Sequence, residues 1–550
     1  DFRHGGWGWY VFKSGYLYNA KNTHLDLKEP EPEQPHVPGH LDWYEGQQNL
    51  QAGYNRKTMR LTESQLRRLI RRRILTEEMI SGDFLAEAAY EAMNDGVKTL
   101  AKFVNWIREN YPEHVSLEKY YDNNCSWINN LVSRKKINTI EKNYDCDWLI
   151  VGAGYTGLSA ARKLGQLYPN QKILLVDAQL AGEGASGRNS GYLVDTTLND
   201  SYSFKRDVDA YQKKINIYDL GINTVKKFIK DYQVDCDWNE AGKYFASSLS
   251  KDLKKLEKFK KLLDKLNFKN EILDETQLEN RLGTKFYKTG IYTNGGVLLH
   301  PAKLVRAMID VLPKSVELLE NSYLNSWKQI NNKIESNVNN YKIISNKIIF
   351  CSNAFLSSMG VKKKFNFPLT LTASLTRKLT KKEYEEIGRP KEWGVLPVRP
   401  MGATVRLTKD RRILIRNTSE YRNPNFMDQK TLDKRILIHK TGLKKRFPSL
   451  PNDIISSSWS GVVSRSSNGS QIFEKLNERV FVAGSYFGSG IGAGTLFGEQ
   501  IALMATNQDS EEIRIIEERK KPNKLPIKPI LNLGIYFRLF YERIIARTEI

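Results

Sequence analysis

The clearest pattern of apolar and polar positions lies between residues 146 and 177. The segment CDWLIV at 146–151 is an apolar run of strand length, and LSAARKLGQLY at 158–168 has the apolar spacing of a helix. A second short run, KILLVD, follows and ends at Asp177. The order strand, helix, strand predicts a βαβ unit with two parallel strands.

A similar junction is predicted near the other end of the chain. Residues 479–483 (RVFVA) form a strand-like run that opens into a glycine-rich stretch at 484–492, and a helical pattern continues to Met504. Between the two junctions we assign GKYFASSL at 242–249 and ATVRLTKDRRILIRN at 403–417 to an antiparallel sheet.

The first 115 residues carry less pattern. We predict irregular or partly extended chain at 1–58, a short Arg-rich helix at 59–75 and a second helix at 84–110. Because a helix follows Met59, we interpret 59–115 as a separate small segment and the residues before it as appended sequence.

Composition and charge narrow the classes of function. A chain of 550 residues with 40% hydrophobic residues exceeds one core and is not wholly disordered. The net charge of +23 suggests a polyanionic partner. However, the apolar spacing of 251–266 places its lysines on a solvated face, and we assign the arginines of 67–73 to a surface helix in preference to phosphate contacts. We therefore expect no specific nucleic-acid partner.

The number and spacing of the cysteines indicate whether a metal site or disulfides are expected, and in which compartment the protein is found. The four cysteines form no CxxC pair or other metal-ligand spacing, so we predict neither a disulfide framework nor a metal site. Reduced thiols are typical of a cytoplasmic protein. The first residues lack a signal-peptide pattern, and because the chain begins at Asp1 we interpret it as a fragment or processed product.

Chemistry is indicated at the turn of the first βαβ unit, which reads G-x-G-x-x-G. Gly152 suits the tight turn, Gly154 allows a pyrophosphate to approach the backbone, and Gly157 lets helix and strand pack closely. The helix N-terminus offers free N–H groups to phosphates. Asp177, 20 residues beyond the third glycine, can accept bonds from ribose hydroxyls and disfavours NADP. A dinucleotide-binding site is predicted.

The choice between NAD and FAD rests on two later features. A glycine-rich loop at 178–191 follows Asp177 where the next helix would be expected, and such a loop lets the chain run along an extended cofactor. The second junction at 479–492 would hold the other end, so we favour FAD. The expected cofactor-binding residues are Gly152, Ala153, Gly154, Tyr155, Thr156, Gly157, Asp177, Ala178, Ala185, Ser186, Gly187, Arg188, Asn189, Gly191, Gly484, Gly488, Gly490, Ile491 and Gly492.

The order of five segments resembles that of the D-amino-acid-oxidase-like (DAO) FAD-dependent oxidoreductases, and most closely the gamma-glutamylputrescine oxidase subgroup. The segments are DWLIVGAGYTGLSAARKL, GEGASGRNSGYLVD, GGVLLHPAKL, IIFCSNAFL and RVFVAGSYFGSGIGAGTLFGEQIA, and the resemblance covers residues 120–515. It implies that the three glycines at 152–157 face the pyrophosphate and that Asp177, where relatives more often carry Glu, faces the adenosine ribose.

The resemblance also implies how the flavin is held. The 185–191 loop would run beside the cofactor, and residues 484–492 would lie against the isoalloxazine ring. The helix beginning near Ile491 would supply positive potential to the ring. No cysteine follows Cys351, so the covalent flavin link of sarcosine-oxidase-like relatives has no counterpart, and we expect a non-covalent flavin.

The predicted fold class is α/β. We expect a Rossmann-like FAD-binding domain built from 145–200, 297–365 and 460–506, with an inserted α+β substrate domain, on an antiparallel sheet, from 201–296 and 366–459. These segments together form the oxidoreductase region, 116–510, which follows the partly helical N-terminal extension and precedes a basic tail at 511–550.

The predicted function is oxidation of the C–N bond of an amine or amino acid by hydride transfer to flavin N5, giving an imine that hydrolyses. Oxygen or another acceptor would take the electrons. Arg188 and Arg465 are candidates for binding a substrate carboxylate, with structural or surface roles as the alternative. His300 is a candidate active-site residue, with packing or helix capping as the alternative.

Two segments have a membrane interpretation. Residues 480–505 carry one charge and small residues at four-residue spacing, as transmembrane helices do, but their glycines suit a loop better. The tail from 521 to 550 is amphipathic and basic, so it either packs on the protein or lies on an anionic membrane surface.

Two other functions remain open from the sequence. The first is an NAD-linked dehydrogenase, which the βαβ unit alone does not exclude. The second is a non-enzymatic binding protein that acts through the Arg-rich helix at 59–75.

Overall fold

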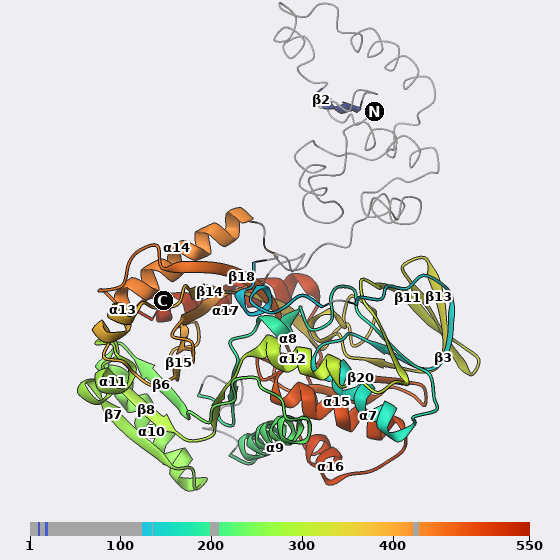
Figure 1. The fold of residues 1–550 in the computed structure, drawn as a ribbon, viewed down its shortest axis with the longest axis horizontal. Coiled ribbons are helices and arrows are strands. Elements are labelled where there is room, and N and C mark those ends of the chain that lie inside the picture. Colours follow the sequence, from blue (N-terminus) through green and yellow to red (C-terminus); the bar gives the residue numbers. More distant parts are fainter. Residues whose placement is uncertain are drawn as a thin grey trace, which may run out of the picture. The chain divides into compact units, whose positions relative to one another are not determined.

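The computed structural model describes residues 124–134, 136–198, 208–421, 427 and 429–549, together with two short strands near the N-terminus (Figure 1). The chain divides into two units, 1–118 and 119–550. In the first unit, β1 (Trp9–Val11) and β2 (Leu17–Asn19) pair antiparallel. The helices predicted at 59–75 and 84–110 lie outside the described residues.

The predicted βαβ unit forms the centre of one sheet. β3 (Tyr144–Val151) leads through α7 (Tyr155–Leu167) to β4 (Ile173–Val176), and the two strands pair in parallel. β13 (Tyr341–Phe350) pairs in parallel with the other edge of β3, and β20 (Val480–Gly484) with β13. Strands from both predicted junctions therefore share one sheet, as two-ended cofactor binding requires. The other strands of this sheet are β10 (Val316–Leu319), β11 (Leu324–Ile330), β12 (Lys333–Val338) and β19 (Ile472–Lys475).

Helices cover one face of this sheet. α15 (Gly492–Ala505) lies against α7 and against α9 (Val208–Tyr232) (Figure 1). α15 and α7 approach so closely that a side chain on Gly498 would not fit: its Cβ would lie 2.2 Å from the carbonyl oxygen of Thr156. This packing brings the start of α15 beside the start of α7, so both predicted glycine loops meet at one place.

The second sheet carries the inserted region. Its strand order is β18-β14-β17-β16-β15-β6-β8-β7, and all neighbours pair antiparallel except β15 with β6. The segments predicted at 242–249 and 403–417 lie in it. Its strands are β6 (Lys243–Ser247), β7 (Asn270–Asp274), β8 (Thr289–Thr293), β14 (Phe367–Thr376), β15 (Trp393–Pro397), β16 (Thr404–Leu407), β17 (Ile413–Glu420) and β18 (Ile455–Arg465).

The two sheets confirm the predicted α/β class with an inserted antiparallel sheet. One predicted boundary differs: β18 pairs along its length with β14, so residues 460–465 belong to the second sheet and not to the first. Residues 460–465 lie close in sequence to β20 of the first sheet, but β18 hydrogen-bonds to β14, a strand much earlier in the chain.

Shorter elements connect the sheets. β5 (Tyr192–Val194) and β9 (Gly296–Leu298) form a separate antiparallel pair between them. The remaining helices are α6 (Ser126–Asn129), α8 (Ala185–Arg188), α10 (Leu253–Lys265), α11 (Glu275–Leu282), α12 (Pro301–Asp310), α13 (Lys381–Glu386), α14 (Gln429–Arg446), α16 (Glu511–Glu517) and α17 (Lys528–Ala546).

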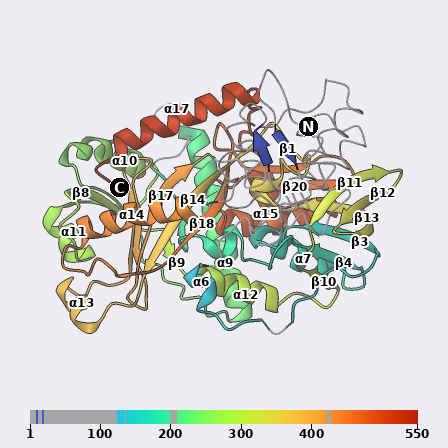
Figure 2. The ribbon, with the colours of Figure 1, turned by 90° about the horizontal axis from the view of Figure 1, so that it is seen from above.

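The C-terminal tail returns to the second sheet. Figure 2 shows α17, in red, along the upper edge of the view. The residues after α17 are held at the end of β6. The carboxylate of Glu549 is buried and accepts hydrogen bonds from Ser247 Oγ (2.9 Å) and the backbone N of Ser248 (2.8 Å). Within the described part of the chain, no helix has the length and apolar character needed to cross a bilayer.

Candidate functional site

The first glycine loop is shaped as a phosphate cradle. Gly152 has a φ of +102°, and a Cβ on Gly157 would lie 1.7 Å from the carbonyl oxygen of Gly152, so a side chain at either position would disrupt the turn. Gly154 caps α7, whose first turn carries no acidic residue. No acidic residue of that turn therefore opposes the positive end of the helix dipole at the cavity, where Tyr155 N donates to Ser186 Oγ at 3.1 Å.

Asp177 stands at the end of β4, where the sequence predicts the ribose site. Its Oδ2 accepts a hydrogen bond from Ala153 N at 2.7 Å, and its Oδ1 accepts one from Gln179 N at 2.9 Å. Burial raises the pKa of Asp177 to about 6, with a further contribution from Glu320. The two backbone bonds fix the carboxylate and leave lone pairs for ribose hydroxyls.

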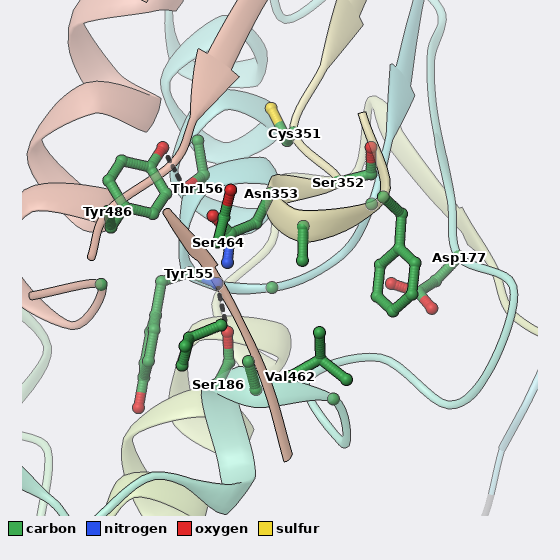
Figure 3. Close-up of a pocket in the computed structure, with 18 of the residues that line it drawn as sticks. Tyr155, Thr156, Asp177, Ser186, Cys351, Ser352, Asn353, Val462, Ser464 and Tyr486 are labelled. Carbon is green, nitrogen blue, oxygen red and sulfur yellow. Dashed lines mark hydrogen bonds between the residues drawn. The ribbon is translucent and has the colours of Figure 1, made fainter. Parts of the chain in front are cut away.

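The cradle and Asp177 line one elongated cavity. Figure 3 shows Asp177 at one side of this cavity and Tyr486 at the other. The predicted cofactor residues that line it are Gly152, Gly154, Tyr155, Thr156, Asp177, Ala178, Ala185, Ser186, Asn189, Gly488, Gly490 and Ile491. The predicted residues outside its lining are Ala153, Gly157, Gly187, Arg188, Gly191, Gly484 and Gly492.

The late glycine loop closes the far end of the cavity. Thr156 Oγ1 donates a hydrogen bond to the hydroxyl of Tyr486 at 2.8 Å, which ties this loop to the first turn of α7 (Figure 3). Ser485 and Phe487 have positive φ values of 65° and 55°, and Asn353 Oδ1 accepts from Ser485 N at 2.9 Å. The loop is thus held in a strained conformation against the cavity.

A second cavity continues from the first. The two share Ala185, Asn189, Ser190, Tyr192, Val462, Val463, Phe487 and Gly488 in their linings. The second cavity extends toward the antiparallel sheet, and its other walls are mostly apolar, formed by Val194, Leu198, Tyr218, Phe245, Leu371, Ala373, Leu396, Pro397, Pro400 and Trp459. Among the described lining residues there is no carboxylate and no histidine.

Arg416 brings a positive charge into this apolar cavity. It lies on β17, and its Nη2 donates to Thr404 Oγ1 at 2.7 Å. Its Nε is buried and has no hydrogen-bond partner among the described residues. Burial lowers the pKa of Arg416 to about 10, so the guanidinium is charged at neutral pH. A charged guanidinium among apolar walls is suited to a carboxylate.

Of the two arginines predicted to bind substrate, one lines the second cavity and the other lines neither cavity. Arg188 lines the second cavity, but its guanidinium donates to the backbone oxygens of Glu183 (2.8 Å) and Ser460 (3.5 Å). Arg465 lines neither cavity, and its guanidinium stacks on the Phe487 ring, 3.9 Å from the centroid. The geometry therefore favours the structural alternative for both arginines.

His300 lines neither cavity and caps a helix. Its Nδ1 accepts a hydrogen bond from Lys303 N at 3.2 Å at the start of α12, and its ring packs edge-on against Trp127. Burial lowers the pKa of His300 to about 4. These contacts match the capping and packing alternative, because a histidine before a proline at a helix start satisfies a free N–H group.

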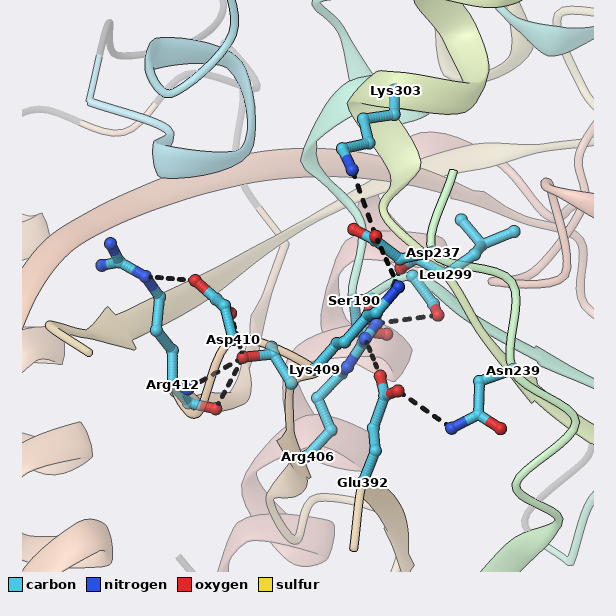
Figure 4. Close-up of polar contacts among 12 residues, drawn as sticks. Ser190, Asp237, Asn239, Leu299, Lys303, Glu392, Arg406, Lys409, Asp410 and Arg412 are labelled. Atoms are coloured by element: carbon cyan, nitrogen blue, oxygen red, sulfur yellow. Dashed lines mark hydrogen bonds and ion pairs between the residues drawn. The ribbon is translucent and has the colours of Figure 1, made fainter. Parts of the chain in front are cut away.

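A buried arginine fixes the loop between the cavities. Arg406 on β16 donates through Nη1 to the carbonyl oxygens of Ser190, Gly191 and Leu299, at 2.8 to 2.9 Å. Figure 4 shows its guanidinium facing Glu392, whose other oxygen accepts a hydrogen bond from Asn239. The second sheet thereby holds the backbone of a loop that lines both cavities.

Sequence reasoning missed Arg416, Arg406 and Tyr486 as site residues. The signal available for the first two was an arginine within a short apolar strand: Arg416 follows Ile413, Leu414 and Ile415, and a charged residue there calls for a specific environment. For Tyr486 the signal was weaker, since an aromatic residue in a glycine-rich loop indicates packing as readily as a site.

Comparison with known proteins defines the class. Residues 147–504 match the DAO family, described as FAD dependent oxidoreductase, which is more than half of the chain. The chain therefore belongs to the DAO family of FAD-dependent oxidoreductases, and the predicted family and cofactor are confirmed. Membership in this family excludes the two alternatives left open by the sequence, an NAD-linked dehydrogenase and a non-enzymatic binding protein.

Individual relatives are distant. The probable oxidoreductase OrdL of Haemophilus influenzae is 22% identical over 412 residues, which cover 68% of this chain and 86% of that protein. Gamma-glutamylputrescine oxidoreductase of Escherichia coli is 26% identical over 383 residues, covering 66% of this chain and 84% of that protein.

Solved structures agree in fold. Glycine oxidase from Geobacillus kaustophilus superposes with a TM-score of 0.57 at 15% identity, covering 67% of this chain and 96% of that one. L-proline dehydrogenase from P. horikoshii superposes with a TM-score of 0.54 at 15% identity, covering 69% and 100%. The glycine cradle, the acid at the end of β4 and the continuous cavity fit an extended FAD.

Proposed function

We propose that this protein oxidises the C–N bond of an amine that carries a carboxylate, such as an amino acid. The observation that carries the proposal is Arg416, a charged guanidinium that lines an apolar cavity without a carboxylate among the described lining residues; this cavity continues the cofactor cavity. Burying a charge without an opposite charge beside it is unfavourable, so the retention of Arg416 there favours an anionic ligand.

The cofactor cavity would hold FAD along its length. The N–H groups at the start of α7 would bind the diphosphate, Asp177 the adenosine ribose, and the loop at 485–491 would border the isoalloxazine ring. When bound, FAD supplies the hydride acceptor at N5. Each part of the FAD expected from the family is thereby given a binding residue or loop of this chain.

The second cavity would position the substrate. Arg416 would bind the carboxylate through a bidentate pair, which fixes the neighbouring carbon and its C–H bond. The apolar walls around it, including Phe245 and Trp459, would exclude water and accept an apolar substituent. Because the described lining holds no carboxylate or histidine, the amine would enter in its neutral form, and the imine product would hydrolyse in water.

The names of the relatives are consistent with this chemistry. Gamma-glutamylputrescine, glycine and L-proline, which appear in the names of three similar proteins, are all amines, and two of them are amino acids. The electron acceptor would be oxygen or another oxidant, and detection of hydrogen peroxide would identify the first case.

Product analysis tests the proposal. The FAD-loaded protein is incubated with a panel of amino acids and the 2-hydroxy acids that match them, and released ammonia is measured together with the carbonyl product. We expect equal amounts of ammonia and carbonyl product from at least one primary amino acid. Turnover of 2-hydroxy acids without any release of ammonia would contradict the proposal.

A further inference from the structure

Helix α17 carries two apolar faces. One face packs on the protein: Ile535, Leu539 and Ala546 are buried in a cluster with Leu369 and Met401 of the second sheet region. The other face is open, and its large apolar side chains are each between 50% and 73% exposed. They are Ile527, Ile530, Leu533, Tyr536, Phe537, Phe540, Tyr541 and Ile544.

The open face is a continuous patch. Its members recur at intervals of three and four residues, for example Ile530, Leu533, Phe537, Phe540 and Ile544, which places them along one side of the helix. In the described part of the chain, 13 large hydrophobic residues are exposed, and eight of them belong to this segment. Scattered exposed apolar residues are ordinary, whereas a concentrated patch indicates a contact surface.

The charges around the patch are of one sign. From residue 519 to 547 the sequence has eight lysines or arginines and one acid, Glu542. Glu542 is buried and paired with Arg538, so it neutralises one of these positive charges and leaves the segment basic. Lys521, Lys524 and Lys528 precede or begin the helix and are exposed.

We propose that α17 and the basic segment before it dock this protein on an anionic phospholipid surface. The helix would lie parallel to the bilayer, with Phe537 and Phe540 at the boundary between headgroups and acyl chains and Lys524 and Lys528 on the headgroup phosphates. A second copy of this chain suits the face less well, because a symmetric contact would bring the two basic rims together. The docking is independent of the reaction proposed above.

Vesicle co-sedimentation of the full FAD-loaded chain tests the proposal. We expect binding to phosphatidylcholine vesicles that contain phosphatidylserine, little binding to pure phosphatidylcholine, and weakening by salt. The double variant Phe537→Glu/Phe540→Glu should lose this binding, while Lys524→Gln should weaken it about fivefold. The matched control is Leu437→Glu on α14, which is 63% exposed and should bind as the unchanged chain does. Absence of binding, or equal binding by the double variant, would overturn the proposal.

A fluorescent label on α17 distinguishes a lipid surface from other partners of the exposed apolar face. All four native cysteines are buried, so a fluorophore attached to the variant Phe537→Cys reports on this face alone. We expect a polar emission in solution that shifts to the blue with phosphatidylserine vesicles. An apolar emission that vesicles leave unchanged would overturn the proposal, and light scattering would then show whether a second copy of the chain covers the face.

Discussion

Arg406 Nη2 donates a hydrogen bond to Glu392 Oε1 at 2.9 Å, and both side chains are almost fully withdrawn from solvent. The pair couples β16 to the end of the segment before β15, and the same guanidinium holds the loop at Ser190 and Gly191. This charge pair therefore connects the substrate side of the molecule to a loop that borders the cofactor cavity.

Replacing Arg406 should destabilise the fold and weaken the hold on the loop at Ser190 and Gly191. We expect Arg406→Met to lower the free energy of unfolding by about 3–5 kcal/mol, because it leaves a buried carboxylate without its partner. The flavin content of the purified variant should also fall. Chemical denaturation and the ratio of flavin absorbance to protein measure the two effects.

The matched control is the double variant Arg406→Met/Glu392→Leu. Since it removes both charges, it should recover part of the lost stability. An Arg406→Met variant that unfolds within about 1 kcal/mol of the unchanged protein and keeps its flavin would show that the pair is not needed.

Gly157 should be intolerant of even a methyl group. The variant Gly157→Ala places a Cβ against the backbone oxygen of Gly152, so α7 must move away from the turn that forms the cradle. We expect loss of most bound FAD and about 1–3 kcal/mol of stability. Gly534→Ala in α17 is the control, because nothing lies within 4 Å of its added Cβ. FAD retained at full occupancy in Gly157→Ala would refute the role of the turn.

Stability should decrease on the acid side of neutrality. His439 is buried, with its ring nitrogens bonded to Ser374 Oγ (2.6 Å) and Asn417 Oδ1 (2.8 Å), and burial lowers its pKa from 6.5 to about 3. The unfolded chain therefore takes up a proton below pH 6.5 that the folded chain does not. This histidine alone should cost about 2 kcal/mol of stability by about pH 5.

The pH series is measured by denaturation at constant ionic strength. In His439→Gln the loss of stability on acidification should become smaller and not vanish, because the pKa of His300 is also lowered, to about 4. The raised pKa of Asp177 acts in the opposite direction in both proteins, since the folded chain takes up that proton first. An unchanged slope in the variant would mean that His439 is not buried in its neutral form.

Local sequence predicted the residues at the proposed nucleotide-binding end of the cavity. The turn at Gly152, its helix and Asp177 lie within 26 residues, and each signal depends on neighbours along the chain. The late loop was also identified, but its glycines serve different purposes. Gly488 lines the cavity, whereas a Cβ on Gly484 would lie 2.8 Å from Leu356 Cδ1. A glycine needed for packing cannot be told in sequence from one needed for a ligand.

The substrate side could not be identified in this way. Arg416 reaches the cavity because β17 pairs with β14 and β16, and these pairings are set by contacts between distant segments. Arg465 and His300 were chosen for their closeness to recognised motifs. One stacks on Phe487 and the other caps α12, which are roles that the folded structure defines.

The most direct test is anaerobic reduction of the bound flavin. The 450 nm absorbance is followed after mixing with an amino acid and, separately, with the amine that decarboxylation of that amino acid gives. We predict that the amino acid bleaches the flavin at a much lower concentration than the amine. Arg416→Met should raise the half-saturating amino-acid concentration about 30-fold or more and leave the half-saturating amine concentration unchanged. Arg412→Met, whose guanidinium pairs with Asp410 outside the cavity, should behave as the unchanged protein. Equal bleaching by both compounds, or no change in Arg416→Met, would show that Arg416 does not bind a substrate carboxylate.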